Sequence, residues 1–398
     1  MKKNILIFGG EFFNKGAQSM SFITISRLKD RFPDHEIIFI SERDSRRHES
    51  ELNNYNFTIS PDPYRRNIVL GENLIRRILK LPIRKSPKEI KRKLKDTEYM
   101  FDISGFALSS QFGEKYSKHY LKRFEKAHES GIKSFILPQS IGPFEYNESQ
   151  DEMIKLISDT LSKVEIVMPR EEQGENLLIN LGLSNNLHKN ADLVLTSRNK
   201  INWDNIYKVK PVSKEFDIDR DSVMIVPNAM NFKHGNREEI VSLYKLTIDE
   251  LLRLNKNIYI VRHSAQDSNA IHILKEEYEA ESKVRVIDED MTPDEFEKLV
   301  SQFDYTIASR FHAIVHSYKV GVPNIILGWA VKYIELSKLF NQEKYVFDVR
   351  SNLSEEVFID KLKYLNDNFA TESMEIQSNL KKIEELSDPF DYIFNTIR

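Results

Sequence analysis

The chain has 398 residues, of which 40% are hydrophobic, and its formal net charge at pH 7 is −3. This length is enough for two α/β domains of ordinary size, and the composition supports a buried core. The near-neutral charge gives no global signature of nucleic-acid binding. The absence of cysteine excludes disulfide frameworks, thiolate metal sites and cysteine nucleophiles.

The N-terminal residues predict the compartment. Residues 1–3 lead directly into an apolar strand, so this segment is too short for a signal peptide. No apolar run in the sequence reaches the roughly 18 residues that a membrane-spanning helix needs. We therefore expect a cytoplasmic protein, which can still associate peripherally with the inner face of the plasma membrane.

Short apolar segments predict the strands of a first domain. They lie at residues 5–8, 36–41, 99–103, 134–138, 166–168 and 190–195. A helical segment, 18–31, follows the first strand after a loop that contains Gly9, Gly10, Asn14 and Gly16. The loop is not a G-x-G-x-x-G dinucleotide fingerprint. Its glycines either let the backbone approach a ligand closely or only make a tight turn. Residues 43–56 are polar and predict a loop.

The segment 76–95 concentrates positive charge. It carries ten lysines and arginines, with Glu89 as the only acidic residue, and leucines and isoleucines are interleaved with them. One interpretation is a solvated pair of helices with an ordinary excess of charge. The other is a surface that meets anionic lipid headgroups or a lipid diphosphate. The sequence leaves both open.

A polar stretch at 197–222, which contains Pro211, predicts a linker to a second domain. Strands are then expected at 222–226, 257–261, 284–287, 303–308, 324–328 and 345–349. The predicted helices are 238–254, 292–303 with Thr292 as N-cap, 312–318 and 355–386. This alternation predicts an α/β fold with doubly wound sheets. The predicted domains are 1–200, completed by 376–398, and 201–375.

The most informative stretch is 308–333. Arg310 and His312 follow the strand 303–308 where a helix begins, and Lys332 lies just beyond the next strand. Ligands of open α/β sheets bind at this edge, and helix N-termini there favour anions. A guanidinium binds phosphate or carboxylate with two parallel hydrogen bonds, and an imidazole moves protons at neutral pH. The alternative is that Arg310 forms a salt bridge at the sheet edge and His312 is an ordinary helix residue.

Several motifs together resemble the polysaccharide pyruvyl transferase family. They are S-R-F-H-A at 309–313, G-V-P at 321–323 with the later Lys332, N-x-G at 14–16, Q-S-x-G-P-F at 139–144 and an arginine at Arg170. Two positions depart from the family pattern, because Ala17 replaces a frequent acidic residue and R-E-E-Q-G replaces R-D-x-x-S after Arg170. The resemblance implies two doubly wound Rossmann-like domains that face a cleft, as in GT-B glycosyltransferases.

The resemblance also implies an activity. The pyruvate unit of phosphoenolpyruvate would be transferred to two hydroxyls of a sugar, forming a cyclic ketal and releasing phosphate, in the synthesis of a bacterial capsule, exopolysaccharide or cell-wall polymer. The acceptors that it suggests include sugars on a polyprenyl diphosphate, which the segment 76–95 would meet at the membrane. No cofactor, metal or nucleic acid is required, and the sequence has no metal-ligand cluster.

The expected site residues divide between the two substrates. Phosphoenolpyruvate, in the second domain, would be bound by Arg170, Arg310 and His312, with Arg310 and His312 also catalytic. The acceptor, on the side of the first domain, would be bound by Lys332, Asp102, Asn14, Gln139 and His263. For three of these the sequence allows a structural role as well: Asp102 as a helix cap, Gln139 in loop architecture and Arg170 in a surface ion pair with Glu171 or Glu172.

Two other functions remain compatible with the sequence. A nucleotide-sugar glycosyltransferase of the same architecture would use Arg310 and Lys332 to hold a diphosphate. A non-catalytic protein that binds sugars or anions would bind the ligand without releasing phosphate. Binding of phosphoenolpyruvate rather than a nucleotide separates the first from a pyruvyl transferase, and phosphate release separates the second.

Overall fold

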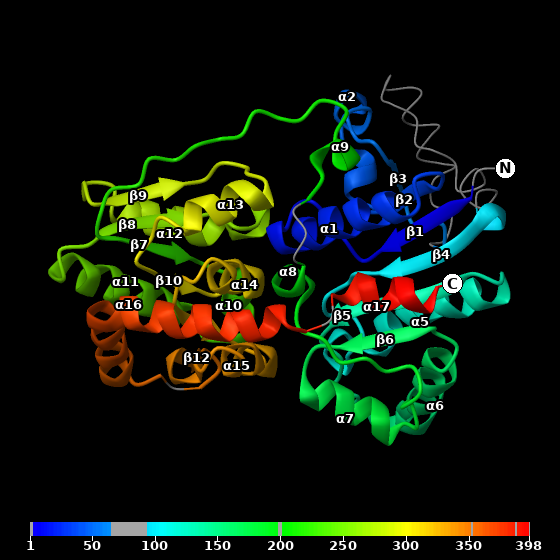
Figure 1. Ribbon diagram of the computed structural model, residues 1–398. Helices are drawn as coiled ribbons and strands as arrows, with labels where there is room; N and C mark the ends of the chain where they lie inside the picture. The colour runs from blue at the N-terminus through cyan, green and yellow to red at the C-terminus, as the bar shows by residue number, and fades with distance from the viewer. Residues whose placement is uncertain (1–2, 65–93, 198–200, 352, 387, 398) are drawn as a thin grey trace, which may run out of the picture. The chain divides into compact units, whose positions relative to one another are not determined.

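The computed structural model describes residues 3–64, 94–197, 201–351, 353–386 and 388–397. The chain forms two compact units (Figure 1), of which unit 1 consists of Met1–Phe12, Ala17–Pro211 and Ser387–Arg398. Unit 2 consists of Phe13–Gly16 and Val212–Leu386. The units therefore divide eleven residues beyond the positions 200 and 375 that the sequence suggested. The C-terminal segment belongs to unit 1, but it begins at Ser387.

Unit 1 is built on a parallel six-stranded sheet with the order β3-β2-β1-β4-β5-β6. The strands are β1 (Asn4–Phe8), β2 (Glu36–Ile40), β3 (Thr58–Ser60), β4 (Thr97–Asp102), β5 (Lys133–Gln139) and β6 (Ile166–Pro169). Its main helices are α1 (Lys15–Arg31), α5 (Glu114–Glu129), α6 (Gln150–Leu161), α7 (Glu172–Asn180) and α17 (Pro389–Thr396). The strand sequences are mostly apolar because helices and loops cover both faces of the sheet.

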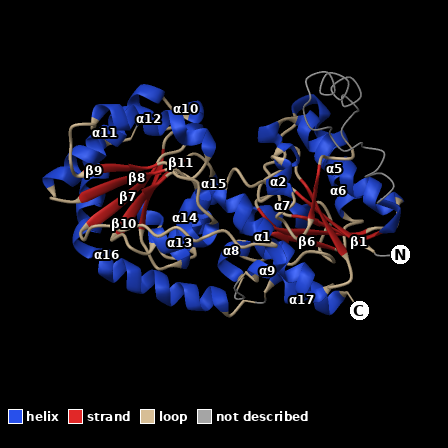
Figure 2. Ribbon diagram, turned by 90° about the horizontal axis from the view of Figure 1, so that it is seen from above, coloured by secondary structure: helices blue, strands red, loops and turns tan. Residues whose placement is uncertain are grey.

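Unit 2 repeats this design, with the sheet order β12-β11-β10-β7-β8-β9. Its strands are β7 (Ser222–Val226), β8 (Asn257–Val261), β9 (Val284–Ile287), β10 (Tyr305–Ala308), β11 (Asn324–Gly328) and β12 (Val346–Asp348). The helices are α10 (Ala229–His234), α11 (Arg237–Arg253), α12 (Ser268–Glu277), α13 (Pro293–Val300), α14 (Phe311–Lys319), α15 (Val331–Lys338) and α16 (Glu355–Glu384). Figure 2 shows helices on both faces of each sheet, as expected for doubly wound folds.

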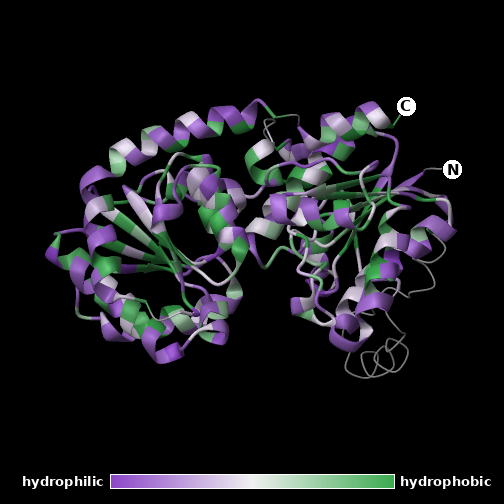
Figure 3. Ribbon diagram, turned by 90° about the horizontal axis from the view of Figure 1, so that it is seen from below, coloured by the Kyte–Doolittle hydropathy of each residue, from purple (hydrophilic) through white to green (hydrophobic). Residues whose placement is uncertain are grey.

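The strand order fixes where each sheet has its ligand-binding edge. Counted within its own unit, each sheet has the doubly wound order 3-2-1-4-5-6, so its winding reverses between β1 and β4 in unit 1 and between β7 and β10 in unit 2. Figure 3 shows largely hydrophobic strands, while the helices alternate between hydrophobic and hydrophilic residues. At the reversal the flanking loops separate, and this is the position at which such sheets bind ligands.

Some local predictions were wrong. The segment 190–195 is not a strand: it leads into a short helix, α8 (Leu193–Thr196), because the Asp192 side chain caps the Val194 N–H at 2.9 Å. The predicted loop 43–56 contains a helical turn, α2 (Glu49–Leu52), and the predicted linker contains another, α9 (Trp203–Ile206). Strand β3 was missed because three residues are too few for a period-2 pattern.

The basic segment 76–95 falls almost entirely outside the described residues. Only its end is described, where Leu94–Asp96 form a 3-10 turn before β4. Within the described parts of the chain, every helix is too short or too polar to cross a bilayer.

Candidate functional site

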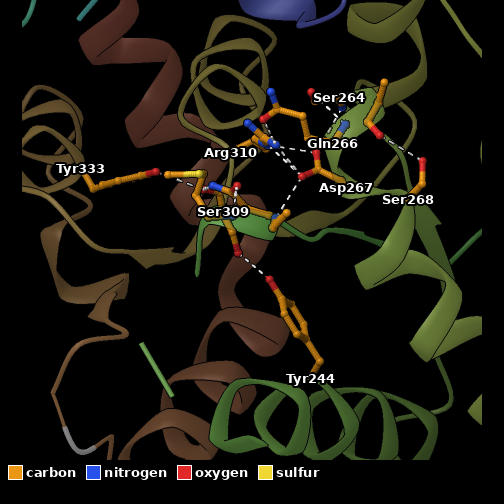
Figure 4. A network of polar contacts seen from close by, with 12 residues as sticks. Tyr244, Ser264, Gln266, Asp267, Ser268, Ser309, Arg310 and Tyr333 are labelled. Carbon is orange, nitrogen blue, oxygen red and sulfur yellow. Dashed lines mark hydrogen bonds and ion pairs between the residues drawn. The ribbon is translucent and has the colours of Figure 1, made fainter. Parts of the chain in front are cut away.

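The turn from β10 into α14 lies at the reversal of the unit 2 sheet. Ser309 holds this turn in place (Figure 4): its hydroxyl bonds to the Tyr244 hydroxyl at 2.6 Å. Its carbonyl accepts hydrogen bonds from Asn228 Nδ2 at 2.9 Å and from the Tyr333 hydroxyl at 3.1 Å. These partners come from three different segments, so the position of the next residue, Arg310, is fixed by buried contacts.

Arg310 forms a buried ion pair with Asp267. Its Nε donates to both carboxylate oxygens at 3.1 and 2.9 Å, and its Nη2 donates to Oδ1 at 2.5 Å (Figure 4). Asp267 is fully buried and also accepts from the backbone N–H groups of Ala229 and Ser264, at 3.0 and 3.2 Å. The salt bridge that the sequence left open as an alternative is therefore present. It uses the Nε–Nη2 edge of the guanidinium.

Two helices start at this edge without a capping side chain. Arg310 is the N-cap of α14 and Ala330 the N-cap of α15, and in the described structure neither makes a side-chain cap hydrogen bond. The first N–H groups of a helix need partners, and the helix dipole makes its N-terminus attractive to anions. His312 and Lys332 each lie at the second position of one of these helices, so an imidazole and an ammonium flank the two N-termini.

Aromatic rings surround the Lys332 ammonium. Its Nζ lies 5.2 Å from the ring centroid of Phe311, 5.4 Å from Trp329 and 5.6 Å from Tyr333. These distances are those of cation–π contacts. The rings restrict the lysine, which is half-buried, so a charged group is held at the carboxyl end of β11.

The N-x-G loop belongs to unit 2 and packs against His312. Asn14 forms an isolated bridge with Ser264, and its Oδ1 accepts from the Gly16 N–H at 3.1 Å. A Cβ atom on Gly16 would lie only 1.9 Å from Cγ of His312. The imidazole therefore lies directly on the glycine backbone, and steric fit explains why this position has no side chain.

His263 lies in the same unit, in the loop after β8. It is 1% exposed, and its ring packs edge-on against Phe296 at 5.0 Å. Burial lowers the pKa of His263 well below its ordinary value, and the nearby His316, Arg310, His312 and Lys15 lower it further. The imidazole is therefore neutral at pH 7.

In unit 1, Asp102 and Gln139 take part in one buried hydrogen-bond network. Asp102 accepts from the Ser104 N–H and hydroxyl, each at 3.1 Å, from the Tyr120 hydroxyl at 3.2 Å and from Arg123 Nη1 at 3.1 Å. Gln139 donates to the Tyr120 hydroxyl at 2.7 Å. Burial raises the pKa of Asp102, although Arg123 and these hydrogen bonds oppose the rise. The network joins the carboxyl ends of β4 and β5.

Arg170 connects the loops at the carboxyl ends of β4, β5 and β6 in unit 1. Its side chain is 4% exposed and forms an ion pair with Asp192. Nη2 donates to the Gly105 carbonyl at 2.9 Å and to the Ser140 hydroxyl at 2.6 Å. The pair with Glu171 that the sequence left open is also present, with Arg170 Nε 3.7 Å from Glu171 Oε1, but it is buried rather than exposed, and Asp192 is the closer partner.

Comparison with known families identifies the chain. A family model described as polysaccharide pyruvyl transferase matches residues 14–330. The chain belongs to this family. The match begins at Asn14 and includes Arg170, Arg310 and His312, whereas Lys332 lies two residues beyond its end. A search of curated proteins gave no match.

Solved structures similar to this pyruvyl transferase family member share its fold. The UDP-GlcNAc 2-epimerase from Methanocaldococcus jannaschii is 13% identical, with a TM-score of 0.51, over 91% of this chain and 92% of that one. A glycosyltransferase from Rickettsia africae is 13% identical, with a TM-score of 0.54, over 99% and 97%. Anabaena Alr3699/HepE in complex with UDP-glucose is 9% identical, with a TM-score of 0.54, over 99% of each chain. At such low identity they support the GT-B fold alone.

The structure thus gathers the predicted residues of this pyruvyl transferase family member in two groups. Unit 2 contains Asn14, His263, Arg310, His312 and Lys332, all near the ends of β8, β10 and β11. Unit 1 contains Asp102, Gln139 and Arg170 at the ends of β4, β5 and β6.

Sequence reasoning missed the acidic partners of both arginines, Asp267 and Asp192. Each aspartate lies in a loop at the same sheet edge as its arginine. This shared position is the feature that would have predicted the two ion pairs.

Proposed function

We propose that the protein transfers the pyruvate unit of phosphoenolpyruvate to two hydroxyls of a sugar in a polysaccharide precursor, forming a cyclic ketal and releasing phosphate. Family membership supports the reaction class. The observation that carries the proposal is the pair of uncapped helix N-termini, α14 and α15, with Arg310, His312 and Lys332 in or beside their first turns. This arrangement suits a small substrate with two anionic groups.

We propose separate roles for the cations. Asp267 holds the Nε–Nη2 edge of Arg310, so an anion would bind at Nη1 together with the first N–H groups of α14. Because Asp267 offsets the charge of Arg310, the helix N-terminus has to supply part of the attraction. Lys332 would contact the acceptor or the departing phosphate from the start of α15. Asn14, in the loop that packs against His312, would line the acceptor site, and His263, buried in the same unit, would support this wall from behind.

The three unit 1 residues fit a supporting role better than direct contact. Arg170, Asp102 and Gln139 are bonded to other protein groups at the carboxyl ends of β4, β5 and β6. We propose that they fix the exit loop 139–144 and the turn at 104–105, and that the backbone and small side chains of these loops meet the acceptor sugar.

The chemistry requires three bond changes. His312, as imidazolium, would donate a proton to the methylene carbon, which makes the neighbouring carbon electrophilic. The first sugar oxygen then forms a bond to that carbon, and neutral His312 takes the hydroxyl proton. The second sugar oxygen displaces phosphate, and its proton also leaves. Of the two hydroxyl protons, one replaces the proton that His312 gave to the new methyl group, and the other departs with phosphate.

The proposal is tested with purified protein, phosphoenolpyruvate and a panel of soluble sugar acceptors, by measuring phosphate release and detecting the ketal methyl group by NMR. Phosphate release that depends on both substrates supports a pyruvyl transferase. Release of a nucleoside diphosphate from a nucleotide sugar, without phosphoenolpyruvate binding, would instead indicate a glycosyltransferase. Binding of phosphoenolpyruvate without turnover on any acceptor would indicate a binding protein.

We also propose that the acceptor is carried on a polyprenyl diphosphate and that the segment 76–95 brings the enzyme to the membrane surface. This proposal rests on the sequence, because residues 76–93 lie outside the described structure. Each lysine or arginine near an anionic surface contributes on the order of 1 kcal/mol, and salt weakens the contribution. Several such residues would hold the enzyme reversibly at the inner face of the plasma membrane.

A further inference from the structure

A second group of ionisable side chains lies behind His312 in unit 2. His316 is one helical turn further along α14, so both imidazoles are on the same side of the helix. His316 is fully buried, and its Nδ1 lies 2.9 Å from Glu297 Oε1 on α13. Lys319 donates to the same oxygen at 3.0 Å. The reaction proposed above makes no use of this group.

The protonation of this pair follows from its contacts. Burial alone would raise the pKa of Glu297, but hydrogen bonds and charges of His316 and Lys319 outweigh it and lower the pKa to about 2. Glu297 is therefore a carboxylate at neutral pH and can only accept. Nδ1 of His316 consequently carries a hydrogen, and Nε2 is the nitrogen that can gain a proton. A carboxylate behind an imidazole also stabilises the imidazolium that forms.

His263 lies beside this pair. Its ring centroid is 6.4 Å from that of His316, and Phe296 packs against both rings at 5.0 and 5.6 Å. Among the described residues, neither nitrogen of His263 nor Nε2 of His316 has a hydrogen-bond partner, although all three atoms are buried. Buried polar atoms are rarely left unsatisfied. The ring separation is too long for a direct bond between nitrogens, but one bridging water would satisfy both.

The cluster is not built to hold a metal. In the described parts of the chain, no three histidine, aspartate or glutamate side chains converge as ligands would. The groups that face His263 and His316 are Glu297 from α13, Lys319 further along α14, Arg310 and His312 at its start, and Lys15 from the N-x-G loop. Apart from Glu297 these are cations or imidazoles, so a proton in this cluster is stable only beside the carboxylate.

We propose that His263 and His316, backed by Glu297, form a buried proton path that serves His312. Its catalytic role rests on the proposed function. After His312 takes the proton of the first hydroxyl, the proton moves through His263 and a bridging water to Nε2 of His316. Neutral His312 can then take the proton of the second hydroxyl. His312 gives this second proton to the departing phosphate, and the proton stored on His316 then returns through the water and His263 to His312. Both imidazoles are back in their starting states, and no proton is gained or lost.

The path is tested without turnover by histidine NMR on the full-length protein labelled with ¹⁵N. The wild type is expected to show His316 with hydrogen on Nδ1 and a titration coupled to that of His312. In His316→Asn, the asparagine amide can still donate a hydrogen bond to Glu297 but cannot bind a proton. This variant is expected to shift the midpoint of the His312 pH titration and to remove its coupling to a second group. His312 titrating identically in the wild type and His316→Asn would overturn the path, whatever the activity.

The kinetic arm uses phosphate release as a function of pH. His316→Asn and Glu297→Gln are each expected to lower kcat by about 10²-fold and to shift the pH profile, with the KM for phosphoenolpyruvate changed by less than about two-fold. The matched control is Glu276→Gln, because Glu276 pairs with His272 at 3.2 Å on α12 where both side chains are 68% exposed. A wild-type kcat and pH profile in His316→Asn overturns the path.

The two arms separate the path from the function on which it rests. Coupled titration without phosphate release on any acceptor would overturn the proposed function and support the proton path. Phosphate release with uncoupled titration would support the function and overturn the path. A drop in the affinity for phosphoenolpyruvate that matches the drop in kcat would show that His316 only supports the fold of α14, which also overturns the path.

Discussion

Replacing Gly16 with alanine is expected to displace the imidazole of His312. The new Cβ would lie 1.9 Å from Cγ, 2.2 Å from Cβ and 2.3 Å from Nδ1 of His312. Carbon atoms in contact are normally about 3.5–4.0 Å apart, so the ring has to move by about 1.5–2 Å. The backbone of Gly16 is not in the left-handed region, so alanine can adopt it without strain. The effect therefore comes from the clash alone.

The size of the effect differs between stability and rate. Alanine in the first turn of α1 favours the helix by up to about 1 kcal/mol over glycine, whereas overpacking costs about 1–3 kcal/mol. The gain offsets part of the cost, so the free energy of unfolding should fall by about 0–2 kcal/mol. Because a misplacement of about 1 Å in a catalytic group costs about 10²-fold in rate, kcat should fall by at least that factor.

The assay combines phosphate release with urea unfolding. Gly174→Ala is the matched control: Gly174 is also a helical glycine with an ordinary backbone, and its closest neighbour, the Ile141 carbonyl, lies 3.1 Å away. It should lower kcat far less than Gly16→Ala does, because the nearest neighbours of its new Cβ belong to Ile141 and not to His312. In a His312→Gly background all three of these atoms are absent and the clash is gone, so Gly16→Ala should no longer destabilise the protein. Wild-type kcat in Gly16→Ala, or equal destabilisation in both backgrounds, would refute the reasoning.

Four further changes test the site and the surface. Arg310→Lys should weaken phosphoenolpyruvate binding by about 1–3 kcal/mol, because an ammonium cannot span Asp267 and the ligand together; an unchanged dissociation constant in calorimetry would contradict this. His312→Asn should lower kcat by about 10²–10⁴-fold at nearly unchanged affinity, and a collapse of affinity would instead make His312 a binding residue. The lowered pKa of Glu297 contributes stability above its unfolded value of 4.5, and this is lost as the pH falls towards about 2. The stability of Glu297→Gln should therefore lack this pH-dependent contribution. If its free energy of unfolding falls with decreasing pH in parallel with that of the wild type, an ionised Glu297 is contradicted. Finally, the wild-type protein should float with anionic vesicles at low salt. A variant with glutamate at four basic positions should not float, but it should keep its activity on a short soluble acceptor. If both proteins float equally, the segment 76–95 is only a solvated surface. The four positions are Arg84, Lys85, Lys88 and Lys91.

Much of unit 2 was predictable because its central strands are buried on both faces. The strands at 257–261 and 324–328 have the predicted bounds, since each is an apolar run between polar or turn residues. The partly exposed edge strand at 284–287 also has the predicted bounds, although it contains Arg285. Thr292 caps α13 in a capping box with Glu295, as its position before the helical pattern indicated. Where an apolar run has only four residues, as in α8, periodicity does not separate strand from helix.

The partners at the site were less accessible from the sequence. Arg310 and Asp267 are 43 residues apart and meet because β10 and β8 both flank β7. That neighbourhood depends on strand order, which local patterns do not contain. The steric role of Gly16 was equally hidden, because it depends on a side chain almost 300 positions away in the sequence, His312. The sequence therefore predicts which residue types lie at the sheet edge, but not which of them contact each other.

The division of the chain has a consequence for biosynthesis. The segment Ser387–Arg398 belongs to unit 1, so all of Val212–Leu386 is synthesised before unit 1 can be completed. Phe390 and Ile393 of α17 are fully buried, and Arg27 of α1 pairs with Asp388 at 3.3 Å. Until these residues leave the ribosome, the nascent unit 1 exposes the apolar surface that they cover. Such surface favours aggregation and chaperone binding. The sheet of unit 1 is therefore covered only after α17 has been synthesised, when all of unit 2 has already been made.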